Sequence, residues 1–386
     1  MIACERVVGR FGGEAAGPAL IVTAGLHGNE PAGVAAARRV LAHLAEHRPA
    51  LRGELTVLAG NLGALRGRVR YVERDLNRQW TPERIAELRA RAELPAAGEE
   101  REQRELFEAL REAVGRARGP LYLIDLHTSS GEGPPFLTVG DTLRNRRFAL
   151  TFPLPILLGL EEQVDGALLE YLGNLGVVTL GVEGGQSASE RSVDHHEAVL
   201  WQSLVSAGLL QADAVPDLAA KRRLLERSAA TAARLVEVRY RHAITPAEEF
   251  RMLPGFTSFH SVRRGELLGH DRRGMVRAPE DGMVLLPLYQ GLGEDGFFIG
   301  REVRPFWLGV SLVLRRLRLA GLMPFLPGVR RHPQRRDVLI VDTRIARAYP
   351  LEIFHLLGFR KLRREGSDLV VSRRSYDLAP PRRIVL

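Results

Sequence analysis

Cysteine, lysine and long apolar runs are scarce in this chain of 386 residues. Cys4 is the single cysteine, so no disulfide can form within the chain. Because no signal-peptide pattern is present either, we expect a reducing, cytoplasmic setting. No apolar run reaches the ~20 residues that span a bilayer, so we expect no membrane insertion. The length suits two domains, whose cores need neither disulfides nor metal for stability.

Lysine occurs only as Lys221 and Lys361, so the net charge of +9 comes almost entirely from arginine. Such a charge could favour an acidic substrate, nucleic acid or an anionic surface, but arginines solvated around the surface explain it more simply. No platform of aromatic and basic residues is visible, so we expect no nucleic-acid partner. The sequence leaves a homo-oligomer open.

Residues 1–213 alternate between segments typical of strands and of helices. This alternation predicts a mainly parallel sheet that is covered by helices on both faces. The predicted strands are 20–24, 55–58, 121–126, 136–139, 156–158 and 177–182, and the predicted helices are 31–47, 83–93, 99–117 and 194–210.

The pattern changes after residue 213. Residues 214–328 predict a linker helix and a small β-rich domain, because short segments alternate there with glycine and proline. Residues 329–386 predict a short α/β extension of unknown role. Residues 306–322 predict an apolar helix that carries several arginines. Such a helix could lie on a membrane surface, but we favour a buried apolar face with the arginines at its rim.

His27 and Glu30 follow the strand at 20–24, and Pro31 opens the next helix. His127 ends another predicted strand, 121–126. Two imidazoles and one carboxylate suit zinc, and a set that leaves the fourth position open is typical of catalytic sites. Asp125 lies two residues before His127, so it faces the same side of the strand and could orient the imidazole. A hydrogen-bonded loop histidine is the alternative for His27 alone.

Two further polar segments are candidates for chemistry. The loop that contains Arg70, Asn77 and Arg78 could bind a carboxylate, since arginine can donate two parallel hydrogen bonds to one. A surface loop with internal ion pairs is the alternative. Glu183 ends the strand at 177–182 and could accept a proton from a metal-bound water. A turn formed by Glu-Gly-Gly is the alternative there.

These motifs together resemble the succinylglutamate desuccinylase/aspartoacylase family, which is similar to the zinc carboxypeptidases. The motifs are Gly25-Leu-His27-Gly-Asn-Glu30, Arg70-Tyr71 with Asp75-Leu-Asn77-Arg78, Asp125-Leu-His127 and Val182-Glu183-Gly184, in that order. The resemblance spans residues 19–210. It implies a mixed, mostly parallel sheet flanked by helices, and residues 214–328 resemble the β-rich C-terminal part of the family.

The resemblance also implies the roles of the site residues. One Zn²⁺ per chain would be held by His27, Glu30 and His127. Glu183 would act as general base and later as acid, while Arg70 would polarise the scissile carbonyl. Asn77 and Arg78 would hold a substrate carboxylate. Members similar to aspartoacylase place a further arginine about ten residues before the catalytic glutamate. Here that position falls near Gly173, and residues 160–186 contain no arginine.

We therefore expect a zinc-dependent amide hydrolase, a deacylase that uses metal-activated water. Its substrate would be an N-acyl amino acid or a related small amide, from which a carboxylic acid is released. The missing arginine means that the identity of the acyl group and of the amine does not follow from the resemblance. One alternative is a peptidase similar to the zinc carboxypeptidases. An alternative of another class is a catalytically inactive binding or scaffold protein.

Overall fold

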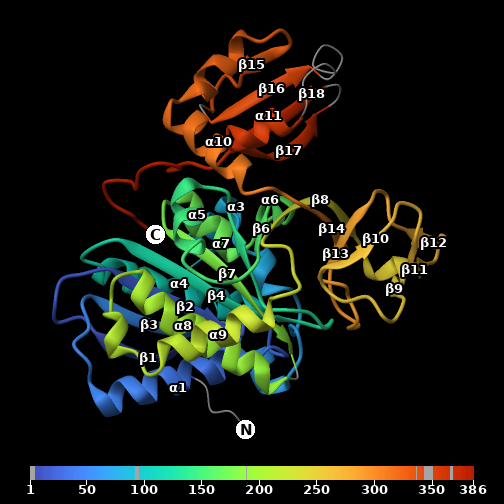
Figure 1. Ribbon diagram of the computed structural model, residues 1–386. Coiled ribbons are helices and arrows are strands. Elements are labelled where there is room, and N and C mark those ends of the chain that lie inside the picture. Colours follow the sequence, from blue (N-terminus) through green and yellow to red (C-terminus); the bar gives the residue numbers. More distant parts are fainter. Residues whose placement is uncertain (1–4, 92–94, 188, 336, 343–350, 366–367) are drawn as a thin grey trace.

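The computed structural model describes residues 5–91, 95–187, 189–335, 337–342, 351–365 and 368–386. Its centre is an eleven-stranded sheet, shown in Figure 1. In spatial order its strands are β1 (Val7–Gly12), β3 (Glu54–Ala59), β2 (Ala19–Ala24), β4 (Leu121–Ser129), β7 (Val178–Gln186), β5 (Phe136–Val139), β6 (Ile156–Leu158), β8 (Leu235–Ala243), β14 (Asp295–Glu302), β13 (Gly282–Leu285) and β10 (His260–Val262).

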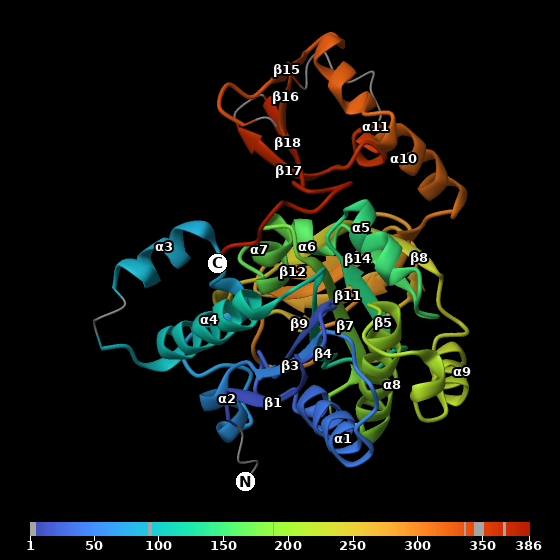
Figure 2. The same ribbon diagram turned by 90° about the vertical axis from the view of Figure 1, so that its left-hand side faces the viewer.

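Helices cover both faces of this sheet (Figure 2). The α-helices are α1 (Ala32–His47), α2 (Leu62–Gly67), α3 (Pro82–Ala90), α4 (Gly98–Arg116), α5 (Leu143–Ala149), α6 (Leu160–Gln163), α7 (Leu168–Asn174), α8 (Glu190–Ser206), α9 (Leu218–Ser228), α10 (Phe306–Arg316) and α11 (Leu351–Leu356). Short 3₁₀ helices are η1 (Leu76–Arg78), η2 (Ala212–Ala214), η3 (Pro246–Glu248) and η4 (Leu319–Phe325). No helix of the described residues has the length and apolar character to cross a membrane.

The buried strand β2 shows how the sequence builds these layers. Successive side chains of a strand point to opposite faces of the sheet. Leu20 and Val22 pack with α1 and α8 in one core, and Ile21 packs with α4 in a second core on the other face. Because both faces are covered, the whole strand is buried. Strands β3, β2, β4 and β7 run parallel, which confirms the predicted α/β architecture.

The β-rich segment after residue 213 extends the same sheet. Strand β8 pairs in parallel with β6, and β14, β13 and β10 follow in antiparallel order. A separate three-stranded sheet lies beyond them and consists of β12 (Gly274–Arg277), β11 (Leu267–Asp271) and β9 (Arg251–Met252). Backbone pairing therefore connects this segment rigidly to the domain that carries the predicted metal ligands.

The C-terminal residues form a small antiparallel sheet with α10 and α11 beside it (Figure 1). Its strands, in spatial order, are β15 (Val329–Arg331), β16 (Val338–Asp342), β18 (Asp368–Arg373) and β17 (Phe359–Glu365). Buried charges join this unit to the main body. Asp141 accepts hydrogen bonds from Arg146 of its own domain and from Arg315 and Arg360 of the C-terminal unit.

The expectation for residues 306–322 was wrong in one respect. A helix forms there, but its buried side chains are Ser311 and Arg315 rather than the apolar ones. Phe306, Val313 and Leu317 are exposed to solvent. The reason is tertiary: the buried Asp141 faces this helix and requires a cationic partner, so Arg315 takes the inward position.

Candidate metal centre

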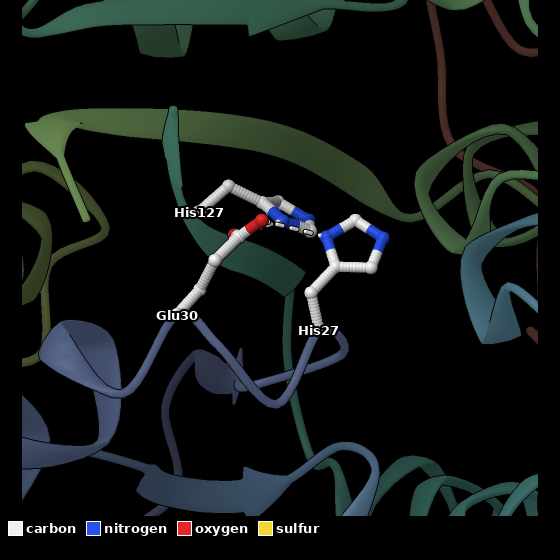
Figure 3. Close-up of side chains that lie close together, drawn as sticks. All are labelled: His27, Glu30 and His127. Atoms are coloured by element: carbon white, nitrogen blue, oxygen red, sulfur yellow. Dashed lines mark hydrogen bonds and ion pairs between the residues drawn. The ribbon is translucent and has the colours of Figure 1, made fainter. Parts of the chain in front are cut away.

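Three predicted ligands meet at the carboxyl ends of β2 and β4 (Figure 3). His27 lies in the turn after β2, Glu30 lies directly before Pro31, the N-cap of α1, and His127 belongs to β4. One potential ligand atom from each lies within 4.8 Å of the others, and all three residues are buried. Parallel pairing of β2 with β4 brings them together, because parallel strands end at the same edge of a sheet.

Glu30 bridges the two imidazoles. Its Oε1 lies 2.9 Å from Nδ1 of His27, and its Oε2 lies 3.1 Å from Nδ1 of His127. The backbone N–H of Thr128 donates to Oε2 as well, at 3.0 Å. Burial alone would raise the pKa of Glu30, but His27 and His127 together hold it far below its usual range. Glu30 is therefore an ionised carboxylate that faces two Nδ1 atoms, which is a donor set suited to a divalent cation.

A carboxylate fixes the other nitrogen of each imidazole. Nε2 of His27 lies 3.0 Å from Oδ1 of Asp75, and Nε2 of His127 lies 2.7 Å from Oδ2 of Asp125. Thr23 donates to Oδ1 of Asp125 at 2.6 Å and holds that carboxylate in turn. Protons held on Nε2 by these carboxylates would leave Nδ1 of each imidazole as the atom able to bind a cation. Carboxylate–histidine pairs of this kind orient the imidazoles of metal sites.

The contact of Asp125 with the imidazole of His127 was expected from the spacing of these residues. The contact of Asp75 with His27 was not expected. Asp75 precedes η1 and caps it by accepting from the N–H of Asn77 at 2.9 Å. The same side chain reaches His27, which lies 48 residues away in the sequence. The only available signal was its place in the polar loop between Arg70 and Arg78.

Glu183 faces this centre from the neighbouring strand β7. It pairs in register with His127 of β4. Its Oε2 is buried and has no hydrogen-bond partner among the described residues. Removal of water around the carboxyl group raises its pKa to about 8, although the charges of His127 and Arg70 act in the opposite direction. An unpartnered carboxyl group beside this cluster of potential metal ligands is suited to accept and release a proton.

Gly184, next in β7, has a structural reason to be glycine. A Cβ at this position would lie 2.4 Å from Nε2 of His196. This His196 nitrogen in turn hydrogen bonds the backbone oxygen of His127 at 2.9 Å. Close approach of α8 to β7 therefore supports His127 from behind.

Two arginines lie at the same pocket, and each is already paired. Nη2 of Arg70 donates to Asp75 at 3.1 Å, and its Nη1 lies 3.6 Å from Oε1 of Glu30. Nη2 of Arg78 donates to Asp295 of β14 at 2.8 Å, and its Nε lies 3.4 Å from Glu294. The pairs hold both guanidinium groups in position.

The side chain of Asn77 also has a structural partner. Its Oδ1 accepts from the backbone N–H of Leu168 at 3.0 Å. This bond connects η1 to the start of α7.

All seven predicted site residues line one pocket: His27, Glu30, Arg70, Asn77, Arg78, His127 and Glu183. Its volume is about 160 Å³, well below the roughly 300–1,000 Å³ of sites for drug-sized ligands. Apolar walls come from the α6–α7 region (Leu160, Val164, Leu169) and from the loop after β13 (Leu286, Pro287, Leu288). The β-rich segment thus closes one side of the site.

The C-terminal unit supplies an arginine that the sequence did not reveal. Arg374 donates to Glu161 and to Glu162, at 3.0 Å each, and Glu161 lines the pocket. Nη1 of Arg374 lies 3.2 Å from where a Cβ on Gly173 would stand. An arginine is absent from residues 160–186, yet a guanidinium from far along the chain occupies the region beside Gly173.

Comparison with known proteins agrees with this arrangement. The model of the Succinylglutamate desuccinylase/Aspartoacylase catalytic domain matches residues 16–198. The succinylglutamate desuccinylase of Burkholderia pseudomallei (strain 1710b) is 37% identical over 110 residues, which are 28% of this chain and 30% of that protein. The matched segment therefore spans less than a third of that relative.

Solved structures share the fold at low sequence identity. A succinylglutamate desuccinylase/aspartoacylase from Rhodobacter sphaeroides superposes with a TM-score of 0.56 at 20% identity, covering 76% of this chain and 87% of that one. The succinylglutamate desuccinylase from Chromobacterium violaceum gives 0.52 at 19% identity, covering 76% and 88%. The match shows that residues 16–198 form a catalytic domain of the succinylglutamate desuccinylase/aspartoacylase type.

Proposed function

We propose that this protein is a zinc-dependent deacylase, which hydrolyses the amide bond of an N-acyl amino acid or a related small amide. The observation that carries the proposal is the buried cluster of His27, Glu30 and His127 next to the unpartnered carboxyl group of Glu183. The name of the Burkholderia relative, succinylglutamate desuccinylase, supports a deacylase. The small pocket supports a small substrate over a long peptide.

The donor set fits one zinc ion. Nδ1 of His27, a carboxylate oxygen of Glu30 and Nδ1 of His127 would hold it, because the Nε2 atoms are engaged by Asp75 and Asp125. A bound zinc supplies Lewis-acid chemistry, which activates water and stabilises negative charge. Ionised Glu30 would offset part of the charge of the cation.

The chain's own residues divide the remaining chemistry. Glu183 accepts the proton of the attacking water at Oε2 and later donates it to the leaving amine. Arg70 is held by Asp75 with its guanidinium at the pocket, where it neutralises the charge that develops on the carbonyl oxygen. Arg78 and the amide of Asn77 hold a carboxylate of the substrate, and Asp295 keeps Arg78 in place.

The test combines metal content with a substrate screen. The purified protein is expected to contain about one zinc per chain by inductively coupled plasma mass spectrometry, as a three-residue cluster implies. It should hydrolyse one class among a panel of N-acyl amino acids. The His27→Ala variant should lose both zinc and hydrolysis while it remains folded.

Three outcomes would count against the proposal. Stoichiometric zinc in His27→Ala would contradict the ligand assignment. Zinc with cleavage of peptides alone would favour the peptidase. Absence of metal after zinc is supplied, with no turnover, would leave a binding or scaffold protein.

A further inference from the structure

In helix α10, Leu308 and Leu314 pack only partly against the neighbouring cores. The buried side chains of the helix are the polar ones, Ser311 and Arg315. On a helical wheel of 3.6 residues per turn, Phe306, Val313 and Leu317 fall on one narrow stripe on the opposite side. These three side chains are 69%, 55% and 65% exposed. The inward positions are accounted for, because Ser311 donates to the backbone oxygen of Leu356 and Arg315 donates to Asp141.

Within residues 306–325, six large apolar side chains of α10, its C-cap and η4 are exposed, which is more than in any other stretch of that length among the described residues. The apolar patch consists of Phe306, Trp307, Val313, Leu317, Leu322 and Phe325. Phe325 is 81% exposed, and the rings of Phe306 and Trp307 pack edge to face. Helix α10 runs along the outer side of the C-terminal unit (Figure 2). Exposed apolar clusters of this kind mark interaction sites.

The same stretch carries an unusual charge. Residues 303–336 contain eight arginines and no acidic residue, which nearly accounts for the net charge of +9 of the whole chain. Arg315 is buried and Arg330 pairs with Asp368, whereas Arg304, Arg316 and Arg318 are exposed. The patch is therefore a set of aromatic and aliphatic side chains bordered by cations.

We propose that the apolar patch and its arginines dock this protein on the surface of an anionic phospholipid bilayer. Apolar side chains would enter the boundary between headgroups and acyl chains, and the arginines would contact lipid phosphates. Helix α10 has 11 residues, too few to span a bilayer, which takes about 20. The docking is thus peripheral and agrees with the lack of any spanning helix among the described residues.

Charge and hydrophobicity together favour lipid over other partners. A second copy of this chain on the same patch would bring two sets of arginines together, which is unfavourable. A nucleic acid would neutralise the arginines but would leave Phe325, Leu317 and Val313 in water. An anionic bilayer satisfies both features at once. The proposal does not depend on the deacylase assignment, since the patch belongs to a different unit from the metal cluster (Figure 1).

Trp307 provides a reporter of docking that the chain already contains. It is one of three tryptophans, and the other two, Trp80 and Trp201, are only 2% and 1% exposed. The full-length protein is mixed with vesicles of phosphatidylglycerol and phosphatidylcholine, or of phosphatidylcholine alone. With the anionic vesicles we expect co-flotation and a blue shift of tryptophan emission at about 0.1 M salt, and both should weaken at about 1 M salt. A Trp307→Phe variant should co-float without the shift.

Two double variants separate the apolar from the electrostatic contribution. Arg316→Glu with Arg318→Glu should weaken vesicle binding about thirtyfold or more. Its matched control, Arg222→Glu with Arg223→Glu, changes the net charge equally at exposed positions of α9 and should bind as the native protein does.

For the apolar contribution, Leu317→Ser with Phe325→Ser should weaken vesicle binding about tenfold or more. Its matched control, Leu150→Ser with Met275→Ser, replaces exposed apolar side chains elsewhere and should leave binding unchanged. Circular dichroism and thermal melting verify that all four double variants are folded.

The proposal is overturned by any of several results. These are absence of binding to anionic vesicles, equal binding to phosphatidylcholine alone, and binding that the patch variants and their controls affect alike. A dimer in solution that Leu317→Ser with Phe325→Ser dissociates would assign the patch to a second copy. Salt-sensitive binding to duplex DNA or RNA in place of vesicles would assign it to nucleic acid.

Discussion

Replacement of Glu183 by glutamine tests the proposed proton transfer most directly. The amide keeps the shape of the side chain but cannot accept the proton of the attacking water. Loss of a general base typically costs 10²- to 10⁴-fold in rate, or roughly 3–5 kcal/mol in activation free energy. Because Glu183 is not part of the metal cluster, we expect Glu183→Gln to retain its zinc.

The structure also predicts the effect of Glu183→Gln on stability. Oε2 of Glu183 has no hydrogen-bond partner among the described residues, so no bond at that atom is lost. Removal of water is the main cause that raises the folded-state pKa of Glu183 from 4.5 to about 8. Ionisation of this group therefore lowers the free energy of unfolding as the pH rises between these values. The metal-free variant should therefore be at least as stable as the metal-free native protein above pH 8.

The assay compares initial rates, zinc content and thermal unfolding of both proteins. Glu132→Gln is a matched control, because Glu132 is an exposed carboxylate in the segment that follows β4, and it should behave as the native protein. A near-native rate for Glu183→Gln with full zinc would refute the assignment of the base. Loss of zinc would show instead that Glu183 is itself a ligand.

Three further predictions follow from the contacts around the site and the domain junction. Asp125→Asn should lower metal affinity about 10- to 100-fold in a chelator competition assay, and unchanged affinity would exclude its role in orienting His127. Arg78→Ala should raise KM more than it lowers kcat, whereas an unchanged KM would exclude carboxylate binding. Burial raises the pKa of Glu237, but His355 and Arg360 lower it from 4.5 to about 2 overall. Its contribution to unfolding free energy, about 3 kcal/mol, should be present above pH 4.5 and be lost toward pH 2. Chemical denaturation should show that Glu237→Gln loses less unfolding free energy between pH 4.5 and pH 2 than the native protein does. Equal losses in the two proteins would contradict this linkage.

Much of the fold could be predicted from local patterns. The strands at 136–139 and 156–158 coincide with β5 and β6, because short apolar runs between turn residues have few other stable conformations. Helix boundaries were less accurate: α8 begins at Glu190, four residues before the predicted start. Helix ends depend on capping and on contacts with neighbouring elements, which a periodic pattern does not report.

The predicted site residues came from positions at strand ends and from a family resemblance. Parallel strands deliver their carboxyl ends to one edge, so His27 and His127 could be expected to meet. The partners of these residues could not be predicted in the same way. Asp75 on His27 and Asp295 on Arg78 depend on how loops and distant strands pack, and neither has a fixed spacing to its partner.

The sequence by itself therefore determined the local elements, the polar residues at the strand ends and the chemistry that those residues can perform. These properties follow from side-chain type and short-range periodicity. Only the tertiary structure decided which arginines are buried. Arg315 and Arg374 are enclosed because Asp141, Glu161 and Glu162 from another part of the chain need partners there. Because desolvated carboxylates require cations, α10 turns its arginine inward and its apolar stripe toward solvent.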